Sequence, residues 1–532
     1  MSARVKAQAL ITPEVRTWAE RSIGRIGKRW AKEDGRALNA LTPAAKKRRK
    51  LLVLHLDGVP RQVLKRALDE DRMPFLSRLV KTGAYHLDNA FWGTPASTPA
   101  FQAGLLFGVR HPDLPAYHWW DRHLGQEVRM NLPKLAVKVE ERVSKLASGS
   151  LLEGGGHTYL SLFRAGADNE LAMTSLAKLR RLVPSVCSHV HGIGDVGERG
   201  AWAFVKDLVN ETRAAGADAL RWVRAVNDNR HELQFMLNRL FIIELAWSLS
   251  WNRALIDMVR GVPAVYLVFG NFDEVAHRRG PFSNQAADAL HRADRAIEEL
   301  YAISRMAPEP YDVVLVTDHG HVDSAPFERE TQRRLKDYLL DPAPGGMPDD
   351  IDRALLQGRA PLELSSPWEA DPVVIESGNF AHVYLTKTAT PLESRELLAW
   401  HRNVLARAAA SPQIGIVAVR RADHAVAIIG GRAFTAEELD SAPLDAEFNR
   451  RAVADLLHEL PHMPTAGDIV LYGQATGSGG TIGFAWEFGS HGGLSRTETD
   501  SMVLWPSDAP VDLGGLTHAT QLHERLSEVY RA

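Results

Sequence analysis

Short, continuously apolar runs are the feature that most limits what this chain can fold into. Several of them are apolar at nearly every position, whereas a strand with one face in water alternates apolar and polar residues. They are therefore predicted to be buried strands of a parallel sheet. The runs are "LLVLHLD" (51–57), "PAVYLVFG" (263–270), "YDVVLVTDHG" (311–320), "DIVLYG" (468–473) and "SMVLWP" (501–506).

Longer stretches with helical character separate these runs, at residues 61–82, 202–260 and 285–306. Strands that alternate with helices are typical of α/β proteins. We therefore expect a mostly parallel central sheet flanked by helices, with inserted helical or cap segments. In such a sheet, ligands bind where the strands end at their carboxyl sides.

Carboxylates and imidazoles stand at those strand ends. The first, second and third apolar runs each end in, or are followed by, such groups, and one further histidine lies in the glycine-rich stretch "EFGSHGGLSR". Asp and His side chains offer the oxygen and nitrogen donors that zinc and similar ions bind. Because three strand ends supply donors at one edge, we expect a metal site there. The candidate ligands are Asp57, Asp273, His277, Asp318, His319 and His491.

A hydroxyl group is the next candidate. In "WGTPASTPAFQAGLLFG" (92–108), Thr98 precedes Pro99 and a small, apolar run that predicts a helix. The first turn of a helix has unpaired N–H groups and the positive end of the dipole, which suit an alkoxide or a bound phosphate. The alternative is that Thr98 only caps the helix.

Taken in order, these motifs resemble the alkaline phosphatase superfamily. They are "LDG" at Asp57, "P-x-x-T" at Thr98, "D-x-x-x-H-x-x-G-P" at 273–281, "TDHG" at 317–320 and "SHGG" at 490–493. The branch that they resemble most is the nucleotide pyrophosphatase/phosphodiesterases. The resemblance spans residues 51–325 and 465–510, and we assign no counterpart to an insertion at about 326–460. It implies a catalytic domain of alkaline phosphatase-like fold over residues 51–532.

The resemblance also implies a ligand set and a mechanism. Asp273, His277 and His491 would hold one divalent ion. Asp57, Asp318 and His319 would hold a second, with Thr98 as its hydroxyl ligand and as the nucleophile. The ions would be zinc, with manganese as the alternative. The implied activity is the hydrolysis of phosphate esters, by a phosphodiesterase or a phosphatase, through a phosphothreonine intermediate.

Departures from the family pattern leave the substrate open. "PAFQAG" follows Thr98, where these phosphodiesterases usually have Phe-Pro-Asn-His, and "HPDLPAYHWWDR" (111–122) has no Asn to hold a phosphate oxygen. A nucleotide preference is therefore not implied. Tyr117, Trp119 and Trp120 could form an aromatic wall for a leaving group, or they could anchor their loop to the core.

Three other functions are alternatives to a phosphate-ester hydrolase. A sulfatase needs a cysteine or serine in C/S-x-P-x-R, and Cys187 in "PSVCSHVHG" has no such context. Phosphoglycerate mutase-like phosphotransfer would use a serine nucleophile and manganese, and Ser97 beside Thr98 keeps it open. A non-catalytic receptor that binds a metal or an anion is the third, but the complete donor set argues against it.

Charge sets the first 50 residues apart. They carry 14 Lys and Arg against 4 Asp and Glu, whereas the whole chain has a net charge of −2. Val15, Trp18, Ile23, Ile26 and Trp30 fall near one helical stripe, which predicts a basic amphipathic helix. This basic N-terminal arm could meet an anionic membrane surface, or its apolar stripe could pack on the body. Nucleic acid is not an expected partner, although "KKRRK" (46–50) is basic.

Composition favours a cytoplasmic protein that is peripheral to the membrane if its arm binds lipid. The single cysteine, Cys187, excludes an internal disulfide framework. The first 18 residues lack the apolar stretch of a secretory signal. "LFIIELAWSLSW" (240–251) contains Glu244 and is too short to cross a bilayer, so we expect a buried helix there.

Overall fold

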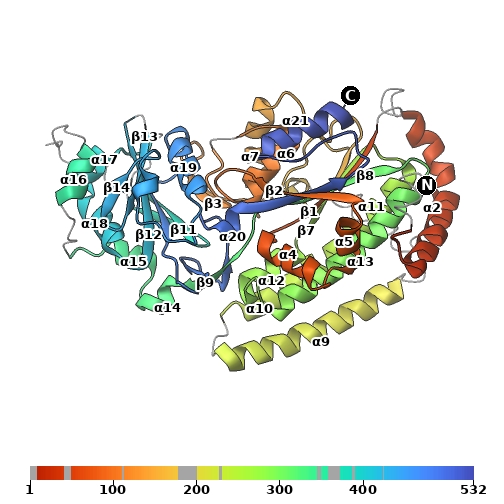
Figure 1. Ribbon diagram of the computed structural model, residues 1–532, viewed down its shortest axis with the longest axis horizontal. Helices are drawn as coiled ribbons and strands as arrows, with labels where there is room; N and C mark the ends of the chain where they lie inside the picture. Colours follow the sequence, from red (N-terminus) through yellow and green to blue (C-terminus); the bar gives the residue numbers. More distant parts are fainter. Residues whose placement is uncertain are drawn as a thin grey trace.

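The computed structural model describes residues 9–40, 49–110, 113–177, 201–226, 230–343, 349–356, 372–385, 390–422 and 424–531. Cys187 and most of the "KKRRK" segment lie outside these ranges. Two sheets dominate the described part of the chain. They lie beside each other along the long axis of the molecule (Figure 1).

The larger sheet has seven strands in the order β2-β18-β8-β1-β7-β5-β6. The central strand β1 pairs in parallel with β7 and β8, and β5 pairs in parallel with β7 and β6. The predicted central, mostly parallel sheet is therefore confirmed. The strands are β1 (Lys50–Leu56), β2 (Tyr85–Phe91), β5 (His157–Tyr159), β6 (Asn169–Leu171), β7 (Ala264–Phe269), β8 (Tyr311–Thr317) and β18 (Asp500–Pro506).

Two of the five predicted strands differ from the expectation of a parallel strand in this sheet. "SMVLWP" is β18, which runs antiparallel to both of its neighbours, β2 and β8. "DIVLYG" forms β15 (Ile469–Gly473), which belongs to the second sheet and pairs antiparallel with β11 and β12 there. Burial on both faces makes a strand continuously apolar whatever its direction, so the composition could not distinguish these cases.

Helices cover both faces of the larger sheet (Figure 1). Alternate residues of β1 enter two separate cores: Leu52 and Leu54 lie in one, and Leu51 and Val53 in the other. The first core is closed by α4 (Arg61–Asp69), α5 (Pro74–Lys81), α11 (Trp247–Arg260) and α13 (Asn284–Met306). The second is closed by α6 (Thr98–Phe107), α7 (Pro133–Leu146) and α21 (Ala519–Tyr530).

The predicted helical stretches are mostly divided in the structure. Residues 61–82 form α4 and α5. Residues 202–260 contain α9 (Ala201–Val226), α10 (Glu232–Asn238), a π-helical segment (Arg239–Ala246) and α11. Only 285–306 forms one helix, α13. None of the helices within the described residues is both long and apolar enough to cross a membrane.

The insertion at 326–460 forms most of the second sheet, whose strand order is β10-β11-β15-β12-β13-β14. All of its strand pairs are antiparallel. Its other strands are β10 (Val373–Ser377), β11 (Phe380–Tyr384), β12 (Ile414–Arg421), β13 (His424–Ile429) and β14 (Arg432–Phe434). Its helices are α14 (Phe327–Thr331), α15 (Leu335–Leu339), α16 (Asp349–Leu356), α17 (Ser394–Trp400), α18 (Arg402–Ala410) and α19 (Arg450–Glu459).

Short elements lie around the two sheets. A two-stranded hairpin is made by β3 (His118–Asp121) and β4 (Gln126–Arg129). A three-stranded sheet joins β9 (Val322–Pro326) to β16 (Thr481–Gly483) and β17 (Gly489–Ser490). In chain order, β9 precedes the second sheet, whereas β16, β17 and then α20 (Arg496–Thr499) lie between that sheet and β18.

The basic arm forms α2 (Pro13–Ala40), and the residues of its apolar stripe from Val15 to Ile26 pack on the body. Ala19 and Ile26 are buried in the first core, and the Trp18 ring stacks on Trp251 of α11 with 5.9 Å between centroids. Arg25 and Lys28, on the outer side, are exposed. Of the two alternatives for this stripe, the structure therefore favours packing on the body, while contact of the basic side with a membrane stays a prediction.

Candidate active site and metal centre

The candidate ligands come from neighbouring strand ends of the larger sheet. Asp57 directly follows β1, and Asp318 and His319 directly follow β8. Asp273 and His277 lie in α12 (Asn271–Arg279), which begins two residues after β7. Because β1 lies between β7 and β8 and is parallel to both, these groups meet at one edge of the sheet.

Thr98 lies within contact distance of one group of donors. It is the first residue of α6, and its Oγ1 is 3.3 Å from Asp57 Oδ1 and 3.2 Å from His319 Nε2. His319 Nε2 is also 3.7 Å from Asp57 Oδ1 and 3.2 Å from Asp318 Oδ2. The four side chains thus converge on a common point.

Ser97 occupies the cap position of α6, so Thr98 is not the capping residue. The Ser97 hydroxyl is buried and has no hydrogen-bond partner among the described residues. Of the two adjacent hydroxyls, only that of Thr98 makes hydrogen bonds to the candidate ligands.

Asp273 is the centre of the second group. Its Oδ2 is 3.5 Å from His277 Nε2, one helical turn further along α12. Its Oδ1 is 3.9 Å from Nε2 of His491, which lies between β17 and α20. The rings of His277 and His491 have centroids 5.0 Å apart. The three residues are therefore neighbours, although the sequence places His491 far from the other two.

The spacing of these donors suits bound ions. Two ligands held at about 2.1 Å by a tetrahedral ion are about 3.4 Å apart. The contacts among Thr98, Asp57, Asp318 and His319 range from 3.2 to 3.7 Å, and the contact of Asp273 with His277 is 3.5 Å. Oxygen and imidazole donors at these separations fit zinc or a similar divalent ion.

Charge in this cluster also favours a cation. Burial, followed by the negative charges of Asp318 and Asp273, raises the pKa of Asp57 well above its ordinary value. Burial opposes ionisation of Asp318 too, but the neighbouring His319 and His55 keep its pKa low. Two carboxylates this close share a proton unless a positive charge replaces it. A divalent ion would supply that charge.

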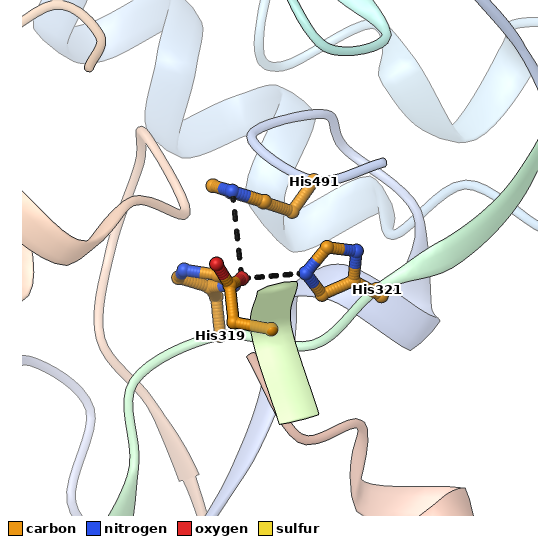
Figure 2. A group of neighbouring side chains, drawn as sticks. His319, His321 and His491 are labelled. Carbon is orange, nitrogen blue, oxygen red and sulfur yellow. Dashed lines mark hydrogen bonds and ion pairs between the residues drawn. The ribbon is translucent and has the colours of Figure 1, made fainter. Parts of the chain in front are cut away.

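Two more histidines enter the site that the sequence reasoning missed. His321 Nε2 is 2.6 Å from Asp273 Oδ1, and its ring lies among those of His319 and His491 (Figure 2). His55, on β1, has its Nε2 3.1 Å from Asp318 Oδ1. The motif "DHGH" (318–321) contained a signal for His321, since it holds a second imidazole two residues after the first. His55 carried no such signal within an apolar strand.

Grouping by distance divides the donors differently from the expected ligand sets. The ligand atoms of one group, Asp273, His319, His321 and His491, lie within 4.8 Å of one another, as do those of the other, His55, Asp57 and Asp318. His277 falls outside both groups. Its Nδ1 lies 3.1 Å from Glu487 Oε2, and burial is outweighed by Glu487 and Asp273, which raise the pKa of His277.

The aromatic residues of the 111–122 stretch do not act together. Trp119 is completely buried in the second core, which agrees with an anchoring role. The pKa of the Tyr117 phenol is raised by burial and by the nearby carboxylates of Glu274, Asp273 and Asp57. Trp120 is partly exposed. Only Tyr117 is thus connected electrostatically with the candidate ligands.

The second sheet supports the loop that carries His491. Asn379, between β10 and β11, donates hydrogen bonds to Thr481 and to Glu498, at 2.9 and 3.0 Å. Glu498 in turn accepts N–H bonds from Gly493 and Ser495. Gly492 has φ +92°, and a Cβ there would be 2.3 Å from the Phe380 ring. The glycines of "SHGG" therefore allow this close approach.

The sequence model of the type I phosphodiesterase / nucleotide pyrophosphatase family matches residues 51–430. The match thus extends into the segment to which the sequence analysis assigned no counterpart. Comparison with curated protein sequences finds no match.

Solved structures give distant similarities. Phosphonoacetate hydrolase from Sinorhizobium meliloti 1021, in complex with phosphonoformate, is 16% identical with a TM-score of 0.44, over 91% of this chain and 96% of that one. Murine ectonucleotide pyrophosphatase / phosphodiesterase 5 is 12% identical with a TM-score of 0.45, over 91% and 95%. An inactive form of the murine protein in complex with AMP is 11% identical with a TM-score of 0.44, over the same shares. Similarity this distant assigns no substrate.

Proposed function

The chain belongs to the type I phosphodiesterase / nucleotide pyrophosphatase family of phosphoester hydrolases, and on this premise we propose that it hydrolyses phosphate esters through a covalent intermediate on Thr98. The observation that supports the nucleophile is the position of its hydroxyl. Thr98 Oγ1 lies within 3.3 Å of both Asp57 and His319, at the first residue of a buried helix.

We propose that two divalent ions, most simply zinc, occupy the donor clusters. Asp57, Asp318, His319 and Thr98 would hold one, and Asp273, His277 and His491 the other. When bound, such ions lower the pKa of a coordinated hydroxyl or water and neutralise the charge on the phosphoryl oxygens. A phosphate ester is an anion, and the carboxylates that repel one another around Asp57 would otherwise repel the substrate as well.

The chain's own groups give the order of the steps. Thr98 Oγ1 attacks phosphorus, and the bond from phosphorus to the leaving alcohol breaks. The proton of the Thr98 hydroxyl ends on that alcohol. Water then attacks the phosphothreonine, the bond from phosphorus to Oγ1 breaks, and Thr98 regains its proton. With a diester as substrate, the intermediate keeps the second ester group, and the product is a monoester.

Helix α6 would assist the first step. Its unpaired N–H groups lie at the end where Thr98 stands, and the positive end of its dipole favours a developing alkoxide and the phosphoryl oxygens. The helix is held firmly, because its residues from Phe101 to Phe107 are buried against α21 and the sheet. A fixed nucleophile avoids the entropy loss of positioning during the reaction.

Substrate class is part of the proposal. We infer that the substrate is a phosphodiester or phosphomonoester whose neutral or aromatic leaving group lies near Tyr117. We also propose that the protein is cytoplasmic. Phosphotransfer through Ser97 is the less supported function, since the buried Ser97 hydroxyl makes no hydrogen bond to the candidate ligands. A receptor without catalysis is the remaining alternative.

A combined metal analysis and substrate panel tests this proposal. Purified protein is assayed for bound zinc and manganese and then offered p-nitrophenyl phosphate, bis-p-nitrophenyl phosphate and a p-nitrophenyl phosphonate. Turnover by metal-loaded protein supports the hydrolase, and faster cleavage of the diester than of the monoester supports a phosphodiesterase. Full metal occupancy with no turnover of any ester would instead indicate a receptor, and absence of bound metal after loading would contradict the two-ion site.

A further inference from the structure

The carboxylates of Asp273 and Asp318 have a common arrangement. In each, one oxygen faces a residue of the expected ligand set: Asp273 Oδ2 lies 3.5 Å from His277 Nε2, and Asp318 Oδ2 lies 3.2 Å from His319 Nε2. In each, the other oxygen lies closest to a histidine outside that set, His321 or His55. Asp273 Oδ1 is also 3.9 Å from Nε2 of His491, a member of the set, but its contact with His321 is much shorter. Both of these histidines are completely buried.

The contact of His321 with Asp273 is too short for two ligands of one ion. Ligands bound at about 2.1 Å to a tetrahedral ion are about 3.4 Å apart. His321 Nε2 is 2.6 Å from Asp273 Oδ1, which is the distance of a strong hydrogen bond to a charged acceptor. His321 Nε2–H therefore donates to Oδ1, and Oδ2 stays directed towards His277.

His55 occupies the corresponding place beside Asp318. The Tyr266 hydroxyl, on the neighbouring strand β7, lies 2.6 Å from His55 Nδ1. When the tyrosine donates to Nδ1, the proton of the imidazole is on Nε2, which lies 3.1 Å from Asp318 Oδ1. The backbone N–H of Gly58 also donates to this oxygen, at 3.1 Å. Oδ1 thus accepts a hydrogen bond from Gly58 and has His55 Nε2 at ion-pair distance, although that contact lacks hydrogen-bond geometry, while Oδ2 remains next to His319.

We propose that His321 and His55 are positioning residues, each of which holds one carboxylate of the metal centre so that a single oxygen is presented to the ion. This inference rests on the proposed two-ion function. Groups that orient metal-bound carboxylates contribute to affinity without touching the ion, and their removal typically weakens binding by about 10- to 100-fold.

Space around His321 agrees with this role. Gly58, with φ +70°, lies against both partners of the pair: a Cβ there would be 2.6 Å from Asp273 Oδ1 and 2.9 Å from the His321 ring. The strand end after Asp57 therefore has to be a glycine for the pair to form. His321 is held between this turn and the rings of His277 and His491, at 4.6 and 4.9 Å between centroids.

Metal affinity is the test, measured by competition with a chelator on the folded protein. His321→Gln keeps an N–H donor near the position of Nε2, whereas His321→Met removes it. We expect the Met variant to bind two ions, with its affinity for one of them lowered about 10- to 100-fold. The Gln variant should recover most of that lost affinity. Tyr266→Phe is a milder change and should lower the affinity for the other ion by a smaller factor.

Two further measurements separate the outcomes. X-ray absorption on zinc-loaded protein should give the same number of histidine ligands per ion in the wild type and in His321→Gln. His523→Gln, a buried histidine on α21 whose Nδ1 contacts Leu105 O, is the control and should leave affinity unchanged.

Each result decides the matter. Loss of a whole equivalent of metal in both His321 variants, with one fewer histidine ligand in the Gln variant, would make His321 a ligand and overturn the inference. Unchanged metal affinity in His321→Met would show that His321 only packs in the core, and would overturn the inference. If the wild type itself binds no metal, the proposed function fails rather than this inference alone.

Discussion

The two sheets of this protein contribute differently to the candidate site. The larger, mostly parallel sheet ends its strands β1, β7 and β8 at a common edge, and five of the six expected carboxylate and histidine ligands follow those ends. The antiparallel sheet supplies none of them. Its turn at Gly378–Phe380 instead supports the loop of the sixth, His491. Strand direction explains the difference, because parallel strands gather all their carboxyl ends on one side and antiparallel strands alternate them.

The largest effect is expected at the edge of the parallel sheet. Thr98→Ala should lower turnover by several orders of magnitude, because it removes the nucleophile while Asp57, Asp318 and His319 remain to bind the ion. Steady-state kinetics on the preferred p-nitrophenyl ester measure the loss, and metal analysis should find two ions still present. Ser97→Ala is the matched control and should stay near the wild-type rate. If Ser97→Ala is slow and Thr98→Ala keeps near the wild-type rate, the nucleophile is Ser97 and the assignment to Thr98 is wrong.

A smaller effect should follow from the antiparallel sheet. Asn379→Ala leaves the buried carboxylate of Glu498 with one donor fewer and loosens the loop of His491, so we expect turnover to fall by about 10-fold. Ser411→Ala, at a buried serine elsewhere in the same domain, should have no such effect. If both variants lose turnover equally, the second sheet contributes general stability and no specific support.

The sequence predicted the parallel half of this comparison much better than the other half. Asp57, Asp273 and Asp318 could be placed at one edge because each stands at the end of an apolar run, and that signal is local. The partner of a strand is not local: "DIVLYG" has the same apolar character as "DVVLVT", yet its register with Phe380–Val383 places it in another sheet. The antiparallel direction of "SMVLWP" was missed for the same reason.

Site residues showed a similar limit. His321 could have been noticed in "DHGH", but nothing in the sequence indicates that it lies 2.6 Å from Asp273, which is 48 residues away. His55 was hidden in a strand that reads as core. Residues whose role is to orient a ligand have no characteristic spacing, because their position depends on how two strands and a helix pack.

Stability should respond to pH in the second sheet. Burial, with the nearby charges of Glu328 and Asp337, raises the pKa of Glu376 on β10 to about 7. Above the ordinary carboxyl pKa, the folded protein keeps a proton on Glu376 that the unfolded chain releases. The contribution of this group to the free energy of unfolding is therefore fully present in acid and is lost as pH rises through 7. Glu376→Gln should therefore have a higher thermal midpoint than the wild type at pH 8 and a similar one at pH 4. Equal midpoints at both pH values would contradict the assignment, and turnover should hardly change.

The smallest effect on turnover is expected from the basic arm. Reversing the charge of Arg25 and Lys28, both exposed on α2, should weaken sedimentation with anionic vesicles in low salt and leave turnover of a soluble ester unchanged. Lys134→Glu with Lys138→Glu, on α7, makes the same change of charge elsewhere. If this control weakens vesicle binding equally, the arm has no specific role at a membrane.

Covalent chemistry at Thr98 is the central claim, and a rapid acid quench tests it most directly. Metal-loaded protein is mixed with bis-p-nitrophenyl phosphate, quenched within one turnover and digested for peptide mass mapping. We predict that the peptide containing Thr98 gains one p-nitrophenyl phosphoryl group, that fragmentation assigns it to Thr98, and that one equivalent of p-nitrophenol is released in a burst. Full turnover with no adduct at any time, or an adduct on Ser97, would contradict it.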